Sequence, residues 1–350
     1  KYIFPVSLHM LGYSETLTDD KELKLIMWFL APFMYFFGTI ALLRLVKLKK
    51  IEIVNAHWIL PNGFIASIVS LFTGVLVVSS LPGSDVYMAK KNFLFSWMAK
   101  FAVRVSKAIT SNSPQLISDL ERVTGINLQK KSTPIIYGVD PSKFKPDRSW
   151  NAKLRSALKI PSDAKIVLGV GRLVAKKGFE YLIKAAPKIL SKSPKTFFVV
   201  VGDGDLTKYL HDLTKKLGVY HKFRFTGWVN YEDLKHYYNL ADIFILPSIR
   251  DEKGNLDDQS VSVVEAMACG KPVVTSNFPG YKVVVENEIN GFLTDQKSVT
   301  QLARTISKLA SSKKLRDEMG RKGRERILSY FSWTAIGKEY SQIFRRVREG

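Results

Sequence analysis

The sequence predicts an α/β protein that contains two consecutive doubly wound parallel sheets. Short apolar segments alternate with amphipathic helical stretches along most of the 350 residues. Alternation of this kind indicates parallel strands that are covered by helices on both faces. The alternation stops at residues 144–150 and then restarts, which indicates two domains joined by a linker. Hydrophobic residues make up 46% of the chain, enough for a core in each domain.

The expected elements follow this order. In the first half we predict strands at Ile51–Trp58, Val75–Ser80, Lys107–Ser111 and Ser132–Tyr137, and helices at Phe64–Phe72, Asn92–Val105 and Pro114–Val123. In the second half we predict strands at Lys165–Val170, Thr196–Val201, Lys222–Thr226, Asp242–Leu246 and Pro272–Thr275, with helices that begin near Gly178, Asp205, Tyr231 and Ser260. The expected domains are residues 1–149 and 150–330, and we expect a C-terminal helix at 331–350 to pack back on the first domain.

One segment bears on location. Leu25–Leu43 is free of charged residues for long enough to cross a membrane. Pro32 and Gly38 interrupt it, so a buried helix pair at the edge of the first domain is one interpretation. Docking at a membrane surface is an equally good interpretation, and a true span is the less favoured alternative. Basic residues flank the segment on both sides, so no orientation is favoured: Lys21, Lys24, Arg44, Lys47, Lys49 and Lys50.

Charge and cysteine content narrow the class of partner. The net charge is +22, and both halves of the chain are basic, which favours anionic partners such as nucleotides and anionic lipid. We find no nucleic-acid-binding motif and expect no nucleic acid partner. The single cysteine, Cys269, cannot form an intrachain disulfide, which fits the cytoplasm. The chain begins at Lys1, and we expect N-terminal material to precede it.

A glycine-rich turn follows the first strand of the second half. It reads Gly169-Val-Gly-Arg-Leu-Val-Ala-Lys-Lys-Gly178 and opens into a helix. Glycines let the backbone approach a ligand, and a helix N-terminus with nearby cations favours an anion such as a diphosphate. The dinucleotide motif requires a third glycine where Val174 stands, so that motif fails. For this loop alone, a plain turn with solvated lysines is an equally good interpretation.

Further motifs lie at later strand ends. Val200-Val-Gly-Asp-Gly-Asp205 and Phe225-Thr-Gly-Trp-Val229 are glycine-rich, and Ala241–Ser248 is a buried strand that ends in Pro-Ser. Asp257 then precedes a predicted helix start, and Glu265 follows eight positions later, more than a turn into that helix. Both carboxylates can face one cleft, one toward a sugar and one toward a ribose.

Taken in this order, the motifs resemble those of the GT-B glycosyltransferases of family 4, clearly over residues 164–330 and more weakly over 51–146. The resemblance implies two Rossmann-like domains that face a cleft, the first incomplete at its N-terminus. It implies that Glu265 holds ribose hydroxyls, that Asp257 contacts the donor sugar, and that Arg172 and Lys177 bind the diphosphate. The other implied donor-binding residues are Gly171, Gly202, Gly227, Trp228, Val229, Ser260 and Val261.

The first half carries segments that look like the acceptor domain of the same family: Asn55–Gly63, Leu81–Tyr87 and Ile136–Phe144. With Asp257, His57 and Asp85 are the candidate catalytic residues. His57 is as readily a residue that closes a strand and bonds to the backbone. The family usually has His where Pro82 stands and Glu where Asp257 stands, and its opening strand with a glycine-rich loop is absent from this chain.

The resemblance implies a retaining, metal-independent transfer of a hexose-type sugar from a UDP- or GDP-sugar to a glycan or lipid-linked acceptor. We expect no cofactor and no metal, because no cluster of His, Asp or Glu has metal-ligand spacing. The expected location is the cytoplasm, with an anionic membrane surface on the inner face as a partner. A catalytically weak nucleotide-sugar-binding protein is the alternative, motivated by Pro82 and the missing N-terminus. A nucleotide-sugar epimerase is disfavoured by the motifs.

Overall fold

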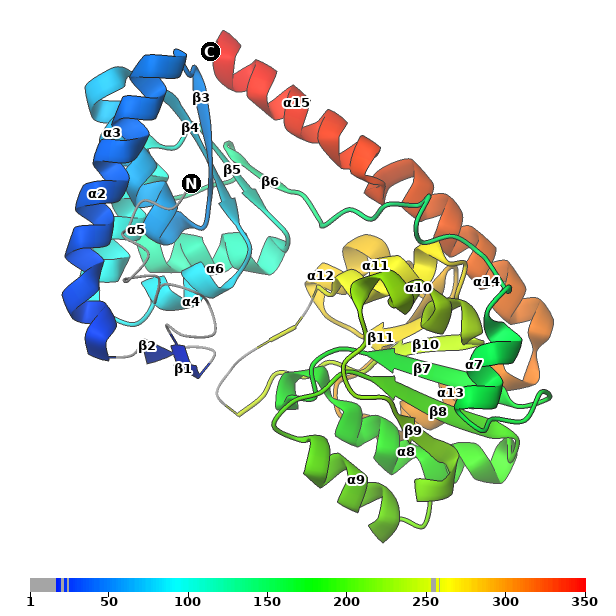
Figure 1. Cartoon of the computed structure of the whole chain (residues 1–350). Helices are drawn as coiled ribbons and strands as arrows, with labels where there is room; N and C mark the ends of the chain where they lie inside the picture. Colours follow the sequence, from blue (N-terminus) through cyan, green and yellow to red (C-terminus); the bar gives the residue numbers. More distant parts are fainter. Residues whose placement is uncertain (1–16, 20–21, 24, 253–255, 258) are drawn as a thin grey trace. The chain divides into compact units, whose positions relative to one another are not determined.

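The structure, a computed structural model, describes residues 17–19, 22–23, 25–252, 256–257 and 259–350. The chain divides into two compact units, each of which is described by itself (Figure 1). Unit 1 holds the described residues up to Ile136 together with Gly337–Gly350, and unit 2 holds Tyr137–Ile336.

Unit 1 is built on a parallel sheet in the order β3-β4-β5-β6. Helices α2 and α3 lie side by side next to strand β3 (Figure 1), and their side chains pack in one cluster with β3 and β4. The described elements are β1 (Leu17–Asp19), β2 (Glu22–Leu23), α2 (Leu25–Lys49), β3 (Ile53–His57), the π-helical turn η2 (Ile59–Gly63), α3 (Phe64–Thr73), β4 (Leu76–Leu81), α4 (Ser84–Ala89), α5 (Phe93–Val105), β5 (Ala108–Ser111), α6 (Pro114–Thr124) and β6 (Ser132–Pro134). Helix α15 (Trp333–Glu349) begins in unit 2 and belongs to unit 1 from Gly337 onward.

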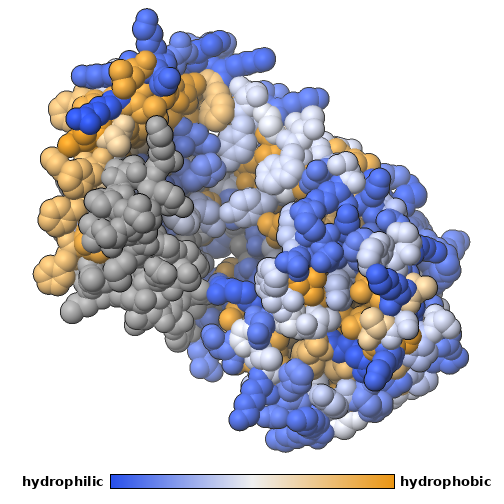
Figure 2. Space-filling view, viewed as in Figure 1, coloured by the Kyte–Doolittle hydropathy of each residue, from blue (hydrophilic) through white to orange (hydrophobic). Residues whose placement is uncertain are grey.

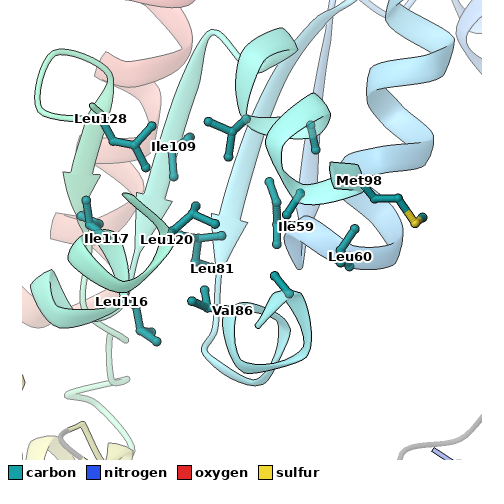
Figure 3. Close-up of a cluster of buried hydrophobic side chains, with 14 residues drawn as sticks. Ile59, Leu60, Leu81, Val86, Met98, Ile109, Leu116, Ile117, Leu120 and Leu128 are labelled. Carbon is teal, nitrogen blue, oxygen red and sulfur yellow. The ribbon is translucent and has the colours of Figure 1, made fainter. Parts of the chain in front are cut away.

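The main core of unit 1 lies between its strands and helices α4, α5 and α6 (Figure 3). Leu81 and Ile109 reach it from β4 and β5, and Leu120 reaches it from α6. The turn η2 adds Ile59, which has no exposed surface. Burial of these side chains fixes the position of the loop that follows β3, because each fully buried aliphatic side chain contributes about 1.5–3 kcal/mol.

Unit 2 is built on a parallel sheet in the order β12-β11-β10-β7-β8-β9. Its described elements are α7 (Asn151–Ala157), β7 (Lys165–Val170), the short 3-10 turn η3 (Ala175–Lys177), α8 (Phe179–Lys192), β8 (Thr196–Val201), α9 (Thr207–Lys216), the 3-10 turn η4 (Tyr220–Lys222), β9 (Phe223–Phe225), α10 (Tyr231–Leu240), β10 (Ile243–Leu246), α11 (Val261–Ala268), β11 (Val273–Ser276), α12 (Pro279–Val284), β12 (Gly291–Thr294), α13 (Val299–Ser311), α14 (Lys313–Arg326) and the π-helical turn η5 (Ile327–Phe331).

The central strands of unit 2 are continuous apolar runs. Every residue of Thr196–Val201 in β8 is buried, as is every residue of Ile243–Leu246 in β10. A strand that is covered on both faces loses the alternation of apolar and polar residues, and β-branched side chains suit it. The predicted strands therefore agree with the observed ones to within a few residues at their ends.

The segment Leu25–Leu43 forms one helix, so the predicted helix pair is wrong. Pro32 lies inside α2 without ending it. Gly38 does not break the helix either, because it lies against α3: a Cβ at Gly38 would be 3.0 Å from the Cδ1 atom of Ile65. The glycine permits close packing of two helices, a tertiary reason that the sequence alone does not reveal. Lys21 and Lys24 lie outside the described residues.

Residues 144–150 pack within unit 2 and are not an extended linker. Phe144 has no exposed surface, and its ring contacts those of Tyr231 and Tyr238 at centroid distances of 5.5 and 5.8 Å. The amide of Asp147 donates to Oδ1 of Asn239 at 2.8 Å. The segment is polar and rich in turn-forming residues, so its composition resembles that of a linker although one aromatic side chain anchors it.

Candidate functional site

The order in which the chain adds strands to the unit 2 sheet reverses between β7 and β10. From β7 the chain continues outward through β8 and β9, and it then returns to the other side of β7 to form β10, β11 and β12. In open α/β sheets, ligands bind beyond the carboxyl ends of the strands at such a switch point. The residues that follow β7 and β10 are therefore the first place to look for a site.

Three glycine-rich strand ends come together beside this point. The amide of Gly171 donates to the carbonyl of Val201, and the amide of Gly202 donates to the carbonyl of Gly227, at 3.0 and 2.9 Å. Gly202 has φ +129°, and a Cβ there would lie 2.1 Å from the carbonyl oxygen of Gly171. Glycine is required because the backbones approach each other too closely for any side chain. The expected donor-binding residues Gly171, Gly202 and Gly227 are thus neighbours in space.

The loop after β7 is fastened to the end of β10. The amide of Ile249 donates to the carbonyl of Lys176 at 2.9 Å. Gly178 has φ +68°, and a Cβ there would lie 1.9 Å from the carbonyl oxygen of Pro247. This contact orients Lys177, which directly precedes Gly178, toward the switch point. Arg172 lies in the same loop with its side chain exposed.

Lys177 and Asp257 form the centre of a polar cluster at the switch point. The Nζ atom of Lys177 lies 2.9 Å from Oδ2 of Asp257 and 3.3 Å from Oγ of Ser260. The two charged side chains are only 12% and 15% exposed, so their attraction is weakly screened. Ser248 and Tyr281 donate to the same carboxylate oxygen at 3.3 and 3.1 Å. The structure therefore brings Lys177 of one motif together with Asp257 and Ser260 of another.

Tyr281 and Ser248 complete this cluster, although the sequence motifs assign neither of them a role. Tyr281 is 1% exposed, and burial and the charge of Asp257 hold the pKa of its hydroxyl well above the usual value. Tyr281 lies in α12, just beyond the carboxyl end of β11. That position, following a strand near the switch point, is the signal that could have identified it.

Glu265 lies on α11 in a different, more buried environment. It is 3% exposed, and the hydroxyl of Tyr238 donates to its Oε2 atom at 2.6 Å. A second hydrogen bond comes from Tyr231. Burial raises the pKa of the Glu265 carboxyl, while these two hydrogen bonds oppose the rise. Asp257 and Glu265 therefore have separate sets of partners, and the two tyrosines are contacts that the spacing of the acidic pair does not predict.

The other expected donor-binding residues lie after β9 and at the start of α11. Trp228 follows β9 and is 73% exposed, with Val229 partly buried next to it. Val261 is the first residue of α11 and is 37% exposed. Residues 253–255 and Asp258, which belong to the loop around Asp257, lie outside the described residues. In the described part of the chain, no three His, Cys, Asp or Glu side chains gather where they could hold a metal ion.

In unit 1, His57 and Trp58 stand at the carboxyl end of β3. His57 is exposed, and its carbonyl accepts a hydrogen bond from the Asn62 side chain at 2.9 Å. Trp58 has φ +71°, which is strained for a bulky side chain. Its amide donates to the carbonyl of Ser80 at 2.8 Å, which holds the turn against β4.

Asp85 binds the backbone of this same turn. Its Oδ2 atom accepts from the amide of Ile59 at 2.7 Å, and its Oδ1 atom accepts from the amide of Gly83 at 3.1 Å. The residue is 2% exposed, and burial raises the pKa of its carboxyl to about 6. These contacts describe a carboxylate that positions the His57–Ile59 turn. Pro82, before Gly83, accepts from the Asn112 side chain at 3.1 Å through its carbonyl.

Comparison with known proteins identifies the family to which the chain belongs. Residues 151–326, just over half of the chain, match the family described as glycosyl transferases group 1. The chain belongs to the glycosyl transferases group 1 family. Residues 18–113 also match a family described as glycosyl transferase 4-like. The family predicted from the motifs is therefore confirmed.

Several relatives are similar to this family member over part of their length. An uncharacterized glycosyltransferase of Methanocaldococcus jannaschii is 34% identical over 64% of this chain and 56% of its own. The GDP-mannose-dependent alpha-(1-6)-phosphatidylinositol monomannoside mannosyltransferase of Mycobacterium tuberculosis is 30% identical over 59% of this chain and 54% of its own. The chain thus spans little more than half the length of these relatives.

Solved structures are similar in fold. HepE of Anabaena, crystallised in complex with UDP, has a TM-score of 0.76 at 21% identity, covering 88% of this chain and 82% of HepE. Sucrose-phosphate synthase of Thermosynechococcus elongatus has a TM-score of 0.72 at 22% identity, covering 90% of this chain and 79% of its own. The predicted GT-B class, with two Rossmann-like parallel-sheet units, is confirmed. The roles expected of individual residues stay predictions.

Proposed function

We propose that this family member is a retaining, metal-independent glycosyltransferase. It transfers a hexose-type sugar from a nucleotide diphosphate sugar to a glycan or lipid-linked acceptor. The observation that carries the proposal is the cluster of Lys177, Asp257 and Ser260 at the switch point of the unit 2 sheet. A cation and a carboxylate side by side match a ligand that presents a diphosphate next to sugar hydroxyls.

The chemistry requires stabilisation of a leaving group whose negative charge grows as the glycosidic bond breaks. Lys177 and the start of α11 supply fixed positive charge and partial charge for this purpose. Arg172 adds a second cation from the same loop. In this proposal no metal ion takes that task. Pro82 cannot accept a proton, so the leaving phosphate is the proposed base for the acceptor hydroxyl.

Asp257 is proposed to bind hydroxyls of the donor sugar, and Glu265 to bind the ribose. The Oδ2 atom of Asp257 already accepts from Lys177, Ser248 and Tyr281, so its Oδ1 atom is the one proposed for the sugar. Tyr238 and Tyr231 hold the Glu265 carboxylate in one orientation. A carboxylate so held is prepared to accept bonds from two vicinal hydroxyls.

The direct test is binding of donors to the intact chain. Thermal-shift measurements with UDP-, GDP- and ADP-sugars should identify one base that raises the unfolding temperature. GDP-sugars belong in the panel because one relative is named as GDP-mannose-dependent. Lys177→Ala should weaken that binding by about 1.5–3 kcal/mol, the usual size of a hydrogen bond to a charged group. Lys188→Ala, which removes an exposed cation from α8, is the control.

A second candidate function follows from Pro82. If the residue in that position must handle a proton, the protein would bind nucleotide sugars without efficient transfer. The donor would then raise the unfolding temperature, while single-turnover assays with the donor would release no sugar to water or to an added glycan. Turnover in those assays would reject this second function, and absence of donor binding would reject both.

The location and the remaining partners are also proposals. We propose that the protein acts in the cytoplasm at the inner face of a membrane, where a lipid-linked acceptor would be available. One relative is named for a phosphatidylinositol monomannoside and another, from Rhizobium meliloti, for lipopolysaccharide core biosynthesis. Those names support an acceptor of the glycolipid or polysaccharide class.

A further inference from the structure

Helix α2 packs against the rest of unit 1 along one of its sides. The ring of Tyr35 lies 5.6 Å from that of Phe64 on α3, with the two planes nearly perpendicular. Gly38 lies against Ile65, and Leu42 packs on the cluster formed by β3, α3 and β4. Val46 is 5% exposed. The spacing of three and four residues places these side chains on one face of the helix.

The opposite side of α2 exposes large aromatic side chains. Phe29, Phe33 and Phe36 are 72%, 57% and 60% exposed, and Phe37 is 44% exposed. Their spacing again puts them on one face, turned away from the packed one. A phenylalanine side chain buries well over a hundred square ångströms when covered, so this row is a large apolar surface (Figure 2). Soluble monomers rarely leave such a surface without a use.

Helix α5 exposes further apolar side chains of unit 1, and its contact with α2 runs through Phe64 on the packed side of α2. The ring of Trp97 lies 6.1 Å from that of Phe64, which in turn contacts Tyr35 of α2. At the start of α5, Phe93 is 86% exposed and Leu94 is 52% exposed, and Trp97 is 51% exposed. The aromatic face is defined here as Phe29, Phe33, Phe36, Phe37, Phe93, Leu94 and Trp97.

Positive charge borders the aromatic face at one end. Arg44 and Lys47 lie on the same side of α2 as the phenylalanines, about two and three turns beyond Phe36, and both are exposed. Lys49 and Lys50 follow at the end of the helix. The whole chain has a net charge of +22. An apolar face with a basic border is complementary to lipid tails beneath anionic headgroups.

We propose that the aromatic face docks into one leaflet of an anionic bilayer, with α2 lying in the plane of the interface. This deepens the proposed membrane location and rests on it, while donor binding is independent of it. To cross the membrane, α2 would have to give up its packing on the rest of unit 1. Gly38 would lose its contact with Ile65, and Val46 would lose its cluster with Val69. A second copy of the chain would bring two strongly positive molecules together, which disfavours it as the occupant. Interfacial aromatic and basic residues favour the leaflet surface.

The test uses the intact chain and two kinds of vesicle. With vesicles of phosphatidylcholine and phosphatidylglycerol, the protein should sediment at low salt and be partly released at high salt. With phosphatidylcholine alone, binding should be weaker. The double variant Phe33→Ser and Phe36→Ser should lower the partition onto anionic vesicles at least about tenfold. Ile289→Ser with Leu328→Ser, two exposed apolar residues of unit 2, is the matched control and should bind as before.

A second readout reports insertion. On vesicle binding, the fluorescence emission should shift to the blue, and Trp97→Phe should reduce that shift although five other tryptophans remain of the six. A smaller shift with retained sedimentation is the expected signature of Trp97→Phe, because phenylalanine still inserts.

Three outcomes would overturn the proposal. Failure to bind anionic vesicles at low salt would reject docking. Retention after alkaline washing would indicate a span. A dimer in solution that the Phe33 and Phe36 substitutions dissociate would assign the face to a second copy. Nucleoside diphosphate affinity is measured for the same variants: it should be unchanged, and its absence in the unmodified chain would count against the proposed function only.

Discussion

Single residues decide the chemistry that each unit can perform. At the switch point of unit 2, the Oδ2 atom of Asp257 accepts from Lys177, Ser248 and Tyr281 at 2.9–3.3 Å. A buried ion pair is stable only when hydrogen bonds satisfy its remaining atoms, and the serine and tyrosine do so here. Glu265 is satisfied by Tyr238 and Tyr231 in the same manner. The carboxylates of Asp257 and Glu265 are thus oriented by different hydrogen-bond partners.

Neutral substitutions can distinguish the proposed roles of Asp257 and Glu265. Glu265→Gln keeps the shape but removes the charge, so its bonds to ribose hydroxyls should weaken from charge-assisted to neutral strength. We expect nucleoside diphosphate affinity to fall about tenfold, corresponding to about 1.4 kcal/mol. Asp257→Asn should lower turnover of the nucleotide sugar without lowering that affinity, because Asp257 is expected to touch the sugar only. Titration calorimetry with the nucleoside diphosphate measures both.

Asp257→Glu is the companion variant, since it restores the side chain that the family usually carries. It should retain turnover if the pocket has the usual depth. If Asp257→Asn loses nucleoside diphosphate affinity while Glu265→Gln keeps it, the two roles are reversed.

Asp85 gives unit 1 a pH-dependent stability. Its pKa is about 6 in the folded chain against an ordinary 3.8, so the folded state holds the proton more tightly. The contribution of Asp85 to stability is therefore complete below about pH 4 and is lost as pH rises through 6. The difference corresponds to roughly 3 kcal/mol at 1.36 kcal/mol per pKa unit.

Asp85→Asn cannot titrate, and its amide group would face a backbone N–H that now donates to a carboxylate oxygen. We expect the variant to be less stable than the unmodified chain at pH 4.5, and the difference in urea midpoint to shrink by pH 7.5. Hydrogen exchange at the amide of Ile59 localises the effect to the turn. A difference that grew with pH would contradict the burial argument.

At the scale of elements, loops at strand ends carry the site, and the sheet determines which loops meet. The loop after β7 reaches the end of β10 because these strands are adjacent, although they are far apart in the sequence. Gly178 permits the contact, since its backbone is left-handed and lies against Pro247. The position of Lys177 therefore depends on a glycine that has no chemical role.

Two glycines test this dependence. Gly178 and Gly218 have nearly equal φ values of +68° and +69°, but only Gly178 has a neighbour in the place of a Cβ. Gly218→Ala should lower the free energy of unfolding by about 1 kcal/mol, the conformational term alone. Gly178→Ala should cost roughly 3 kcal/mol, because the 1.9 Å approach to the Pro247 carbonyl must also be relieved.

Thermal unfolding of both variants measures the difference. Gly178→Ala should also weaken nucleoside diphosphate binding, because Lys177 moves with the loop, whereas Gly218→Ala should not. Equal unfolding temperatures in the two variants would mean that the β10 end yields easily and does not fix the loop.

At the scale of the whole molecule, the net charge and the family membership are the two features that indicate the class of ligand. The net charge of +22 favours anionic ligands and anionic surfaces in general. The chain belongs to the glycosyl transferases group 1 family over unit 2, and unit 1 matches the glycosyl transferase 4-like family. Each unit presents its motifs at the carboxyl ends of a parallel sheet.

The proposed use of protein cations in place of a metal is testable on the intact chain. Transfer activity should survive EDTA, because Lys177 and Arg172 provide the positive charge for the leaving diphosphate. Activity is measured before and after chelation, with magnesium and manganese added back. Loss of turnover that either metal restores would show that the charge at the site comes from an ion.

The sequence by itself determined the fold class and the family. Runs such as Phe197–Val201 and Ile243–Leu246 predict buried parallel strands, because strands covered on both faces read as short continuous apolar runs rich in β-branched and aromatic residues. Glycines at 171, 202 and 227 predict strand ends where backbones approach closely. These signals are local, and a local pattern is enough to indicate the state of its own segment.

Tertiary structure decided what lies against what. Tyr281 reaches Asp257 and Tyr238 reaches Glu265 only because non-adjacent strands and helices are brought together by the sheet order. In the sequence, Gly38 indicates a helix break, but in the structure it allows α3 to pack closely against α2. Which side of α2 is exposed follows only from which side packs on the rest of unit 1. Contacts between distant segments leave no periodic signal along the chain, so they follow from packing and not from local preference.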